Sequence, residues 1–101
     1  MKPLRDQQCP LCQRAAQFRF ADFENQKHFY CVDCTEYRIS TRAELRLAES
    51  IPEWRRQFAE KARQAKENTV WVITLPTSRE HEGVANPALV GTYVLRKDLP
   101  T

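Results

Sequence analysis

Two short segments, Cys9-Pro-Leu-Cys12 and Cys31-Val-Asp-Cys34, contain all four cysteines of this 101-residue chain. Each Cys-x-x-Cys segment directs two sulfurs toward one point. Eighteen residues lie between the two segments, which lets the chain double back and bring the pairs together. Four thiolates arranged in this way complete a tetrahedral zinc site. The spacing therefore predicts one structural zinc ion bound by Cys9, Cys12, Cys31 and Cys34.

Other uses of the four cysteines remain open at this stage. Disulfides require an oxidising compartment, and the opening residues contain no apolar leader segment. A redox dithiol uses one Cys-x-x-Cys segment at the start of a helix, whereas this chain has two. Thiolates also bind other soft metals and iron–sulfur clusters. Zinc is the interpretation that uses both segments together.

Length and charge limit the classes of protein to consider. The chain is long enough for a single domain, which we place at residues 1–101. No apolar run approaches the ~18 residues that span a bilayer, so we expect a cytoplasmic protein without membrane contact. The formal net charge is +3, but four zinc-bound thiolates and the ion lower it to about +1. Charge alone is therefore a weak argument for nucleic-acid binding.

Short alternating segments surround the cysteine pairs. Gln17-Phe18-Arg19-Phe20 alternates polar and aromatic residues and predicts a strand. His28-Phe29-Tyr30 leads into Cys31 as its partner strand, and Tyr37-Arg38-Ile39 alternates again. The polar segment 22–27 is typical of the turn between the first two strands.

Residues 9–39 resemble a four-cysteine zinc ribbon. The resemblance rests on Cys-Pro-x-Cys, the aromatic hairpin, and Tyr30-Cys31-x-x-Cys34-x-x-Tyr37-x-Ile39, about a third of the chain. It implies that the four cysteines are the metal ligands. It also implies a fold shared by transcription, translation and defence-associated proteins, by adaptors and by structural inserts. Many ribbons have glycine after the second cysteine of each pair, where the backbone is left-handed; Gln13 and Thr35 stand there, so we expect strained or altered turns.

The middle of the chain predicts two helices. Thr41 followed by Glu44 has the capping-box spacing, and the first helix then has an apolar side. Ser50 followed by Glu53, with proline between them, repeats the signal for a second helix over about 51–67. The expected apolar positions are Leu45, Leu47, Ala48 and Ile51 in the first helix, and Trp54, Phe58, Ala62 and Ala65 in the second.

The last third predicts two strands. Val70 to Leu75 is an apolar, β-branched run that is typical of a strand buried on both faces. Ala88 to Lys97 predicts the second strand. The expected fold is α+β: a zinc ribbon at 5–40, a helical pair at 41–68, and a β-hairpin at 69–97 with a loop at 76–87. We expect all strands to join one mixed or antiparallel sheet.

Catalytic groups are scarce in the sequence. Zinc with four cysteine ligands has no open position to activate water. His28 adjoins the second cysteine pair, where a polar strand residue or a hydrogen-bonding partner of the site is the expected role. His81 stands among Ser78, Glu80 and Glu82, but sequence neighbours in one loop rarely form a triad. We therefore expect a protein that is not an enzyme and has no small-molecule substrate.

Two functions fit these observations best. The first is a protein-interaction, adaptor or regulatory module with structural zinc. The second is a DNA- or RNA-binding regulator, because residues 37–66 hold eight basic and four acidic side chains. Its candidate phosphate contacts are Arg38, Arg42, Arg46, Arg55 and Lys66, with Arg19 between two phenylalanines. The rings of Phe18, Phe20, Phe29 and Tyr30 are either a stacking platform for bases or, as is more common in so small a metal domain, the core itself. A thiol sensor that releases zinc on oxidation is a third, weaker hypothesis.

Overall fold

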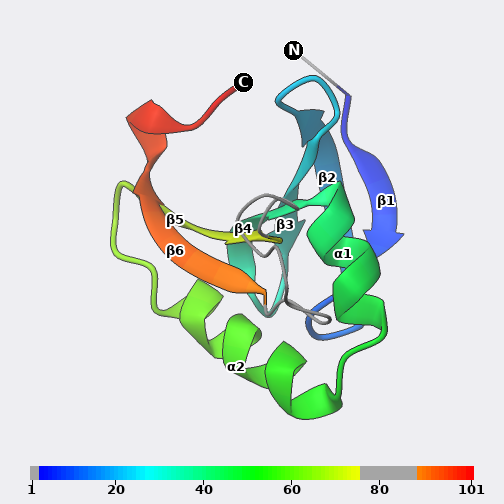
Figure 1. The fold of residues 1–101 in the computed structure, drawn as a ribbon. Coiled ribbons are helices and arrows are strands. Elements are labelled where there is room, and N and C mark those ends of the chain that lie inside the picture. Colours follow the sequence, from blue (N-terminus) through cyan, green and yellow to red (C-terminus); the bar gives the residue numbers. More distant parts are fainter. Residues whose placement is uncertain (1–2, 76–88) are drawn as a thin grey trace, which may run out of the picture.

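The computed structural model describes residues 3–75 and 89–101. Within these ranges six strands form one sheet in chain order, and two α-helices connect β4 to β5 (Figure 1). The strands and helices are β1 (Arg5–Gln8), β2 (Ala15–Ala21), β3 (Gln26–Cys31), β4 (Thr35–Ser40), α1 (Thr41–Ala48), α2 (Pro52–Arg63), β5 (Thr69–Thr74) and β6 (Val90–Leu95). The predicted α+β class and the single mixed sheet are confirmed.

The sheet is antiparallel except at its centre. β4 and β5 are parallel, and every other neighbouring pair is antiparallel. A parallel pair needs a long crossover, which the two helices provide. Sequence patterns missed β1, because Arg5-Asp6-Gln7-Gln8 has no apolar alternation; this segment becomes a strand by pairing with β2. The predicted loop at 76–87 lies outside the described residues.

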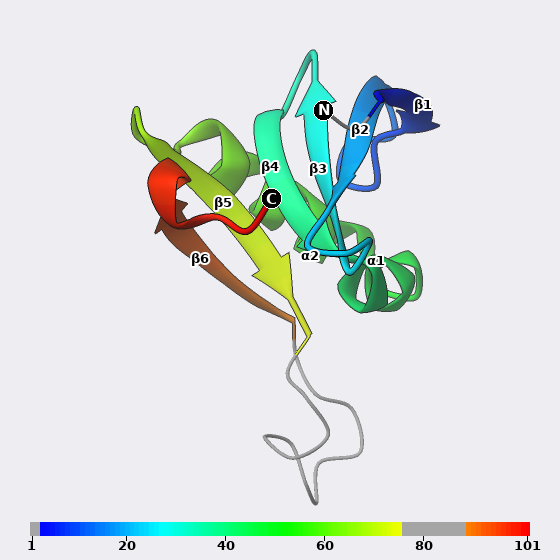
Figure 2. The ribbon, with the colours of Figure 1, turned by 90° about the horizontal axis from the view of Figure 1, so that it is seen from above.

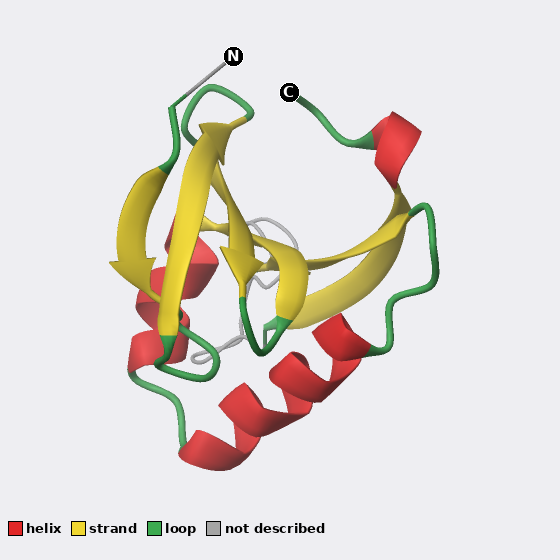
Figure 3. Ribbon diagram, turned by 180° about the vertical axis from the view of Figure 1, so that it is seen from behind, coloured by secondary structure: helices red, strands yellow, loops and turns green. Residues whose placement is uncertain are grey.

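A row of aromatic side chains crosses the helix-facing side of the sheet. Successive strand partners from β2 to β6 are Phe18, Phe29, Tyr37, Trp71 and Tyr93. Phe29 and Tyr37 stack with ring centroids 5.2 Å apart, and Trp71 lies 4.7 Å from Tyr93. Both helices lie along one side of the sheet (Figure 3), and the buried core includes Leu47 of α1 together with Phe58 and Ala62 of α2. This row of aromatic side chains therefore forms the part of the hydrophobic core that the sheet contributes.

The helix starts differ from the capping predictions. Ser40, not Thr41, caps α1, because its Oγ accepts from the backbone N–H of Ala43 at 3.0 Å. Glu44 does not reach back to the cap, since its carboxylate pairs with Lys27 at 2.9 Å. The α2 cap is Ile51, which makes no side-chain hydrogen bond. Ser50 instead donates to the Arg46 carbonyl.

The apolar faces of the helices are also narrower than predicted. In α1 the buried residues are Ala43 and Leu47, while Leu45 is 74% exposed. In α2 the buried residues are Phe58, Ala59 and Ala62, and Trp54 is 42% exposed. Within the described residues, no helix has the length and apolar composition to cross a membrane.

The predicted burial of β5 on both faces is confirmed. Val70, Trp71, Val72 and Ile73 are all buried. Trp71 and Ile73 face the helices as part of the core cluster, so Val70 and Val72 face the opposite side, here called the far face. The far face is partly covered by the segment after β6, which runs back toward β4 (Figure 2).

The C-terminal segment is held over the far face by buried polar groups. Arg38 is 1% exposed and its guanidinium donates to the carbonyl of Pro100. The backbone N–H of Asp22 donates to the carbonyl of Thr101 at 2.8 Å. Arg38 Nε also donates to Nδ1 of His28 at 3.1 Å. Because an arginine nitrogen only donates, the proton of the neutral His28 ring resides on Nε2.

Glu36 completes this network from β4. It accepts a hydrogen bond from His28 Nε2 and two from Arg96, at 2.7 and 2.8 Å. The Arg96 hydrogen bonds, together with His28, lower the pKa of Glu36 to about 2. Burial lowers the pKa of His28 below its ordinary value of 6.5, and the positive charge of Arg38 acts in the same direction. The far face is therefore stabilised by an ionised Glu36 and a neutral His28.

The neutral state of His28 predicts a loss of stability in mild acid. The unfolded chain binds a proton as the pH falls below 6.5, whereas the folded chain binds it only at lower pH. We expect zinc-loaded protein to lose up to about 1.4 kcal/mol of unfolding free energy per pH unit below 6.5 from this group. Urea unfolding at a series of pH values from 7.5 to 5.5 measures the loss.

The matched control is His28→Gln, which keeps an acceptor and a donor but does not titrate. Protonation of the cysteines affects both proteins alike, so the difference between the two pH profiles isolates His28. Glu36 does not contribute in this window, because its lowered pKa keeps it ionised. Parallel profiles for wild type and His28→Gln would contradict the assignment.

Candidate metal centre

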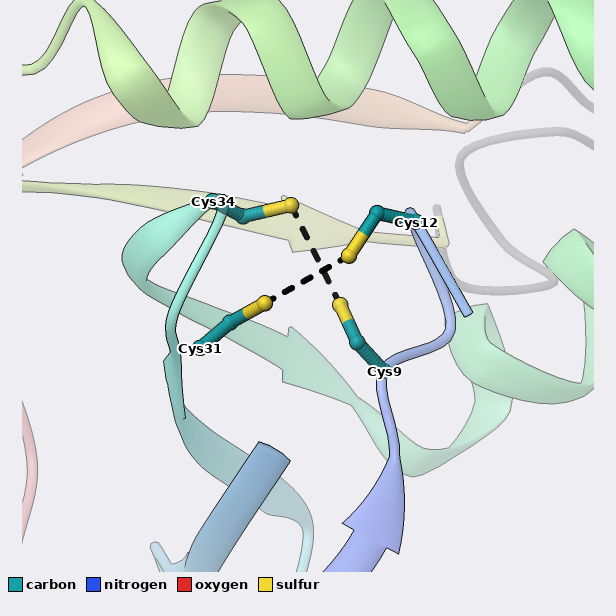
Figure 4. Close-up of side chains that lie close together, drawn as sticks. All are labelled: Cys9, Cys12, Cys31 and Cys34. Carbon is teal, nitrogen blue, oxygen red and sulfur yellow. Dashed lines mark hydrogen bonds between the residues drawn. The ribbon is translucent and has the colours of Figure 1, made fainter. Parts of the chain in front are cut away.

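The four cysteine sulfurs converge on one point. All four Sγ atoms lie within 4.8 Å of one another (Figure 4). The first pair lies between β1 and β2, and the second pair between β3 and β4. Cys9 and Cys34 are completely buried, Cys31 is 6% exposed, and Cys12 is half-buried. The sequence prediction that these four residues come together is borne out by this cluster.

The sulfur separations fit metal ligation and not disulfides. All four cysteines are free, with Sγ atoms 4.0 Å apart for Cys9 and Cys34 and 3.4 Å apart for Cys12 and Cys31. A disulfide has an S–S bond of about 2.05 Å. Tetrahedral zinc with Zn–S bonds of about 2.3 Å separates its sulfurs by about 3.8 Å. The sulfur separations therefore fit a metal ion bound by four thiolates, such as zinc.

The backbone around each pair explains this convergence. In the first pair the N–H of Gln13 donates to the Cys9 carbonyl at 2.8 Å, which closes the turn. In the second pair the N–H of Asp33 points at the Cys31 sulfur, 3.4 Å away. Gln13 and Thr35, which follow the two pairs, have φ of 66° and 70°. Both turns keep the left-handed conformation expected of ribbons, although neither residue is glycine, so both are strained as predicted.

Tyr37 connects the cysteine cluster to the core. Its hydroxyl lies 3.1 Å from Cys9 Sγ, and its ring stacks on Phe29. Burial raises the pKa of Tyr37, and the nearby Cys9 charge raises it further, so the hydroxyl remains a hydrogen-bond donor. Such donors orient metal-bound thiolates. Sequence analysis placed Tyr37 on a strand but missed this contact, whose only signal is its position three residues after Cys34.

Burial and hydrogen bonding shift the thiol pKa values within the cluster in opposite directions. Hydrogen bonding with Cys34 and with Tyr37 lowers the pKa of Cys9 to about 4, against the opposing effect of burial. The hydrogen bond to Cys9 and burial raise the pKa of Cys34, and burial raises the pKa of Cys12 to about 11. A divalent cation supplies the positive charge that lets all four ionise. When bound, it serves as a cross-link, because four protein ligands leave no open position.

Arginines surround the less buried side of the cluster. A hollow of about 320 Å³ beside Cys12 is lined by Arg14, Arg55, Arg56 and Arg63, with Asp33 as its acidic residue. Four thiolates and one divalent cation carry a net charge of −2. The arginines therefore provide opposite charge next to an anionic centre.

The six predicted phosphate contacts are not gathered on one surface. Arg38 is buried on the far face, so its side chain is not accessible to phosphate; strand alternation did not reveal that the C-terminal segment covers it. Arg19 lies on the same face and donates to Tyr30. Arg55 donates to the carbonyls of Leu47 and Ala48 at the end of α1. Arg42 is exposed on α1, and Lys66 is exposed beyond the end of α2. Arg46, also on α1, is partly buried and pairs with Glu49.

The aromatic and histidine candidates are also placed by the structure. Phe18 and Phe29 are buried in the core and Phe20 packs against it, whereas Tyr30 is 40% exposed on the far face. These four rings therefore do not share one stacking surface. His28 is hydrogen-bonded to Glu36 and Arg38 and has no contact with the cysteines among its hydrogen bonds here. The segment around His81 lies outside the described residues.

The chain matches no protein-family model, no curated protein and no solved structure. The resemblance of residues 9–39 to a zinc ribbon therefore rests on the cysteine spacing and on the clustered sulfurs.

Removal of the metal is expected to unfold the whole domain. The cysteines belong to the same buried cluster as Leu47, Phe58 and Trp71, so the helices depend on the site. Structural zinc contributes about 10–16 kcal/mol of apparent binding free energy in small zinc peptides. We expect Cys31→Ser, or chelation of the wild type, to abolish both the helical circular dichroism signal and the near-ultraviolet signal of Trp71.

Val32→Ser is the matched control, because Val32 lies between the ligands of the second pair and is 85% exposed. It should bind zinc with the wild-type stoichiometry and unfold at the wild-type temperature. Helical signal that survives complete metal removal would show that the helices and C-terminal strands fold independently.

The left-handed residue Thr35 gives a second prediction. A positive φ costs a β-branched residue about 1–2 kcal/mol, and replacement by glycine removes this cost. Glycine in turn lowers the free energy of unfolding by about 0.5–1 kcal/mol, because its unfolded chain has more conformational entropy. We expect Thr35→Gly to stabilise the zinc-loaded protein by about 0.5–1 kcal/mol in urea unfolding. Thr74→Gly, the same change inside β5, should destabilise it by a similar amount. Equal losses for both variants would mean that Thr35 is not strained.

Proposed function

We propose that the protein is a non-enzymatic module in which structural zinc supports a surface that binds another protein. The closed four-cysteine centre argues for a structural metal, since it offers no position for substrate. The observation that carries the proposal is a large, mainly apolar hollow at the β2–β3 turn. Its volume is about 1140 Å³, and it is lined by Leu4, Arg19, Asp22, Phe23, Tyr30, Pro100 and Thr101.

Phe23 is the central residue of this surface. Its side chain is 89% exposed beside the hollow. Asp22, Phe23 and Glu24 have φ of 50°, 55° and 67°, so the turn that presents Phe23 is left-handed at three successive non-glycine residues. Strain of this kind is maintained only where surrounding contacts impose it, and it is typical of functional segments. An exposed aromatic on such a turn has the character of an anchor for a partner protein.

The zinc centre and the C-terminal segment hold this turn in place from two sides. Cys31 pairs with Ala16 at one end of the β2–β3 hairpin, and Ala21 pairs with Gln26 next to the turn. Thr101 accepts the hydrogen bond from the Asp22 N–H. Arg19 and Asp22 place one charge of each sign at the hollow. These features fit a partner segment with an apolar side chain and polar flanks.

Nucleic-acid binding is the second candidate, favoured by the four arginines of the hollow beside Cys12. Those arginines face a centre with a net charge of −2 when zinc is bound, and Arg63 is paired with Asp33 and Glu60. The electrostatic attraction of these four arginines for a phosphate is therefore weaker than their number indicates. Protein binding is the better supported function.

The test begins with a photoreactive phenylalanine analogue in place of Phe23, in cells that naturally contain the protein. A discrete cross-linked partner is then purified and titrated with zinc-loaded protein. We expect Phe23→Ala to weaken its binding about 30-fold, or about 2 kcal/mol, because a central anchor is lost. Val32→Ala, which truncates an equally exposed apolar residue outside the hollow, should leave the affinity unchanged.

Three outcomes would contradict protein binding at this surface. The first is the absence of any discrete adduct at position 23. The second is an equal effect of Phe23→Ala and Val32→Ala. The third is tight binding of labelled DNA or RNA that falls steeply between about 50 and about 200 mM salt, which would support the arginine hollow instead.

A further inference from the structure

β6 is an edge strand whose outer side lacks the usual protection against pairing. It lies at one end of the sheet, opposite β1 (Figure 2), and within the described residues its strand partner is β5. Its residues, Val90-Gly91-Thr92-Tyr93-Val94-Leu95, include no charge and no proline. Exposed edges of this kind pair with other chains unless charges, proline or short length prevent it. The other edge strand, β1, has four residues and carries Arg5 and Asp6.

Alternate residues of β6 direct their backbone groups away from β5, where the described part of the chain places no further strand. The N–H of Arg96 donates to the carbonyl of Asn68 at 2.7 Å, in register with the β5–β6 ladder. Hydrogen-bonded pairs alternate along an antiparallel ladder, so Val90, Thr92 and Val94 direct their backbone groups toward β5. Gly91, Tyr93 and Leu95 therefore direct their N–H and C=O groups outward.

The side chains along this edge are apolar and exposed. Val90 is 48% exposed, Tyr93 40% and Leu95 46%. The Tyr93 side chain lies on the helix-facing side of the sheet, where its hydroxyl donates to the Lys61 carbonyl at 2.7 Å. Gly91 has no side chain, and the indole of Trp71 occupies the space next to its Cα. A Cβ on residue 91 would lie 2.0 Å from this ring. The helix side of this edge thus carries an exposed tyrosine, while the space at the glycine is filled by the Trp71 ring.

We propose that β6 pairs antiparallel with β6 of a second copy of this chain, with the two-fold axis at Thr92. This register sets Thr92 opposite Thr92, Val90 opposite Val94, and Leu89 opposite Leu95. It also sets Gly91, whose side-chain space the Trp71 indole fills, opposite Tyr93 of the second copy. All paired side chains are uncharged, and residues opposite each other lie on the same face, as the pleat requires.

A neighbouring symmetric register, with its axis at Tyr93, is less favourable. An axis at Tyr93 also preserves the faces, but it sets Val90 opposite Arg96, whose guanidinium is bound to Glu36 of its own chain. The axis at Thr92 does not require Arg96 to give up its hydrogen bonds to Glu36. The result is an isologous dimer with one sheet running through both copies. This surface lies at β6 and is separate from the partner hollow at the β2–β3 turn, so either proposal can fail alone.

Sedimentation equilibrium of zinc-loaded protein, from about 1 µM to about 1 mM, tests the dimer. We expect a reversible monomer–dimer equilibrium in the wild type. Thr92→Lys sets two positive charges together at the axis and should raise the dissociation constant at least tenfold. Gln17→Lys adds the same charge to an exposed site on β2, on the same face of the sheet, and should leave the constant unchanged. A monomer at every concentration, or equal effects of both lysines, would overturn the proposal.

Disulfide trapping tests the register. Thr92→Cys, incubated zinc-loaded with oxidised glutathione, should form an inter-chain disulfide between the two introduced thiols, with glutathione taking up their electrons and protons. Tyr93→Cys should form none, because it faces Gly91 of the second copy. Zinc content measured before and after oxidation verifies that the native cysteines are retained as ligands. Cross-linking at Tyr93→Cys and not at Thr92→Cys would refute the axis at Thr92.

Discussion

The structure depends on the meeting of two loops through four sulfur atoms. Cys9 and Cys12 belong to the β1–β2 loop, and Cys31 and Cys34 to the β3–β4 loop. A cation bound between them ties together the first four strands at one end. Tyr37 extends this restraint into the core, because its hydroxyl reaches Cys9 while its ring belongs to the aromatic row. Small domains have little core of their own, and a metal cross-link at such a site adds to their stability.

The far face is organised by a different interaction. A fully buried arginine is costly unless its charge is hydrogen-bonded. Arg38 meets this requirement with the His28 ring, with Gln26 and with the carbonyl of Pro100. The C-terminal segment is thus part of the fold: it covers one face of β4 while the helices cover the other. The same segment borders the hollow beside Phe23, so the polar network and the proposed binding surface are physically connected.

The metal centre, the partner hollow and the β6 edge occupy different parts of the molecule. The cysteines are mostly buried, and their four sulfurs lie close enough together to hold one metal ion. The hollow offers an apolar depression with a strained aromatic turn, and the edge offers backbone hydrogen bonds. A side-chain anchor and a sheet edge recognise different chemistries, and this is why we assign them to a partner protein and to a second copy of the chain, respectively.

Local sequence patterns determined much of this protein. The spacing of the cysteines predicted their cluster because a Cys-x-x-Cys turn directs both sulfurs by local geometry. Alternation found β2, β3 and β4, and the apolar run at 70–75 predicted a strand buried on both sides. The resemblance to zinc ribbons led us to expect strained or altered turns at Gln13 and Thr35, and both residues have positive φ.

Tertiary structure decided the features that arise between distant segments. β1 exists through its pairing with β2, and Glu44 pairs with Lys27 of β3 instead of reaching back to the start of α1, where Ser40 is the N-cap. Arg38 is buried because a segment sixty residues away in sequence returns to cover it. Alternation along a strand separates its two faces but does not tell which face another part of the chain will cover. The sequence by itself therefore determined the cysteine cluster and the class of fold, whereas long-range contacts decided which charged and aromatic side chains remain at the surface.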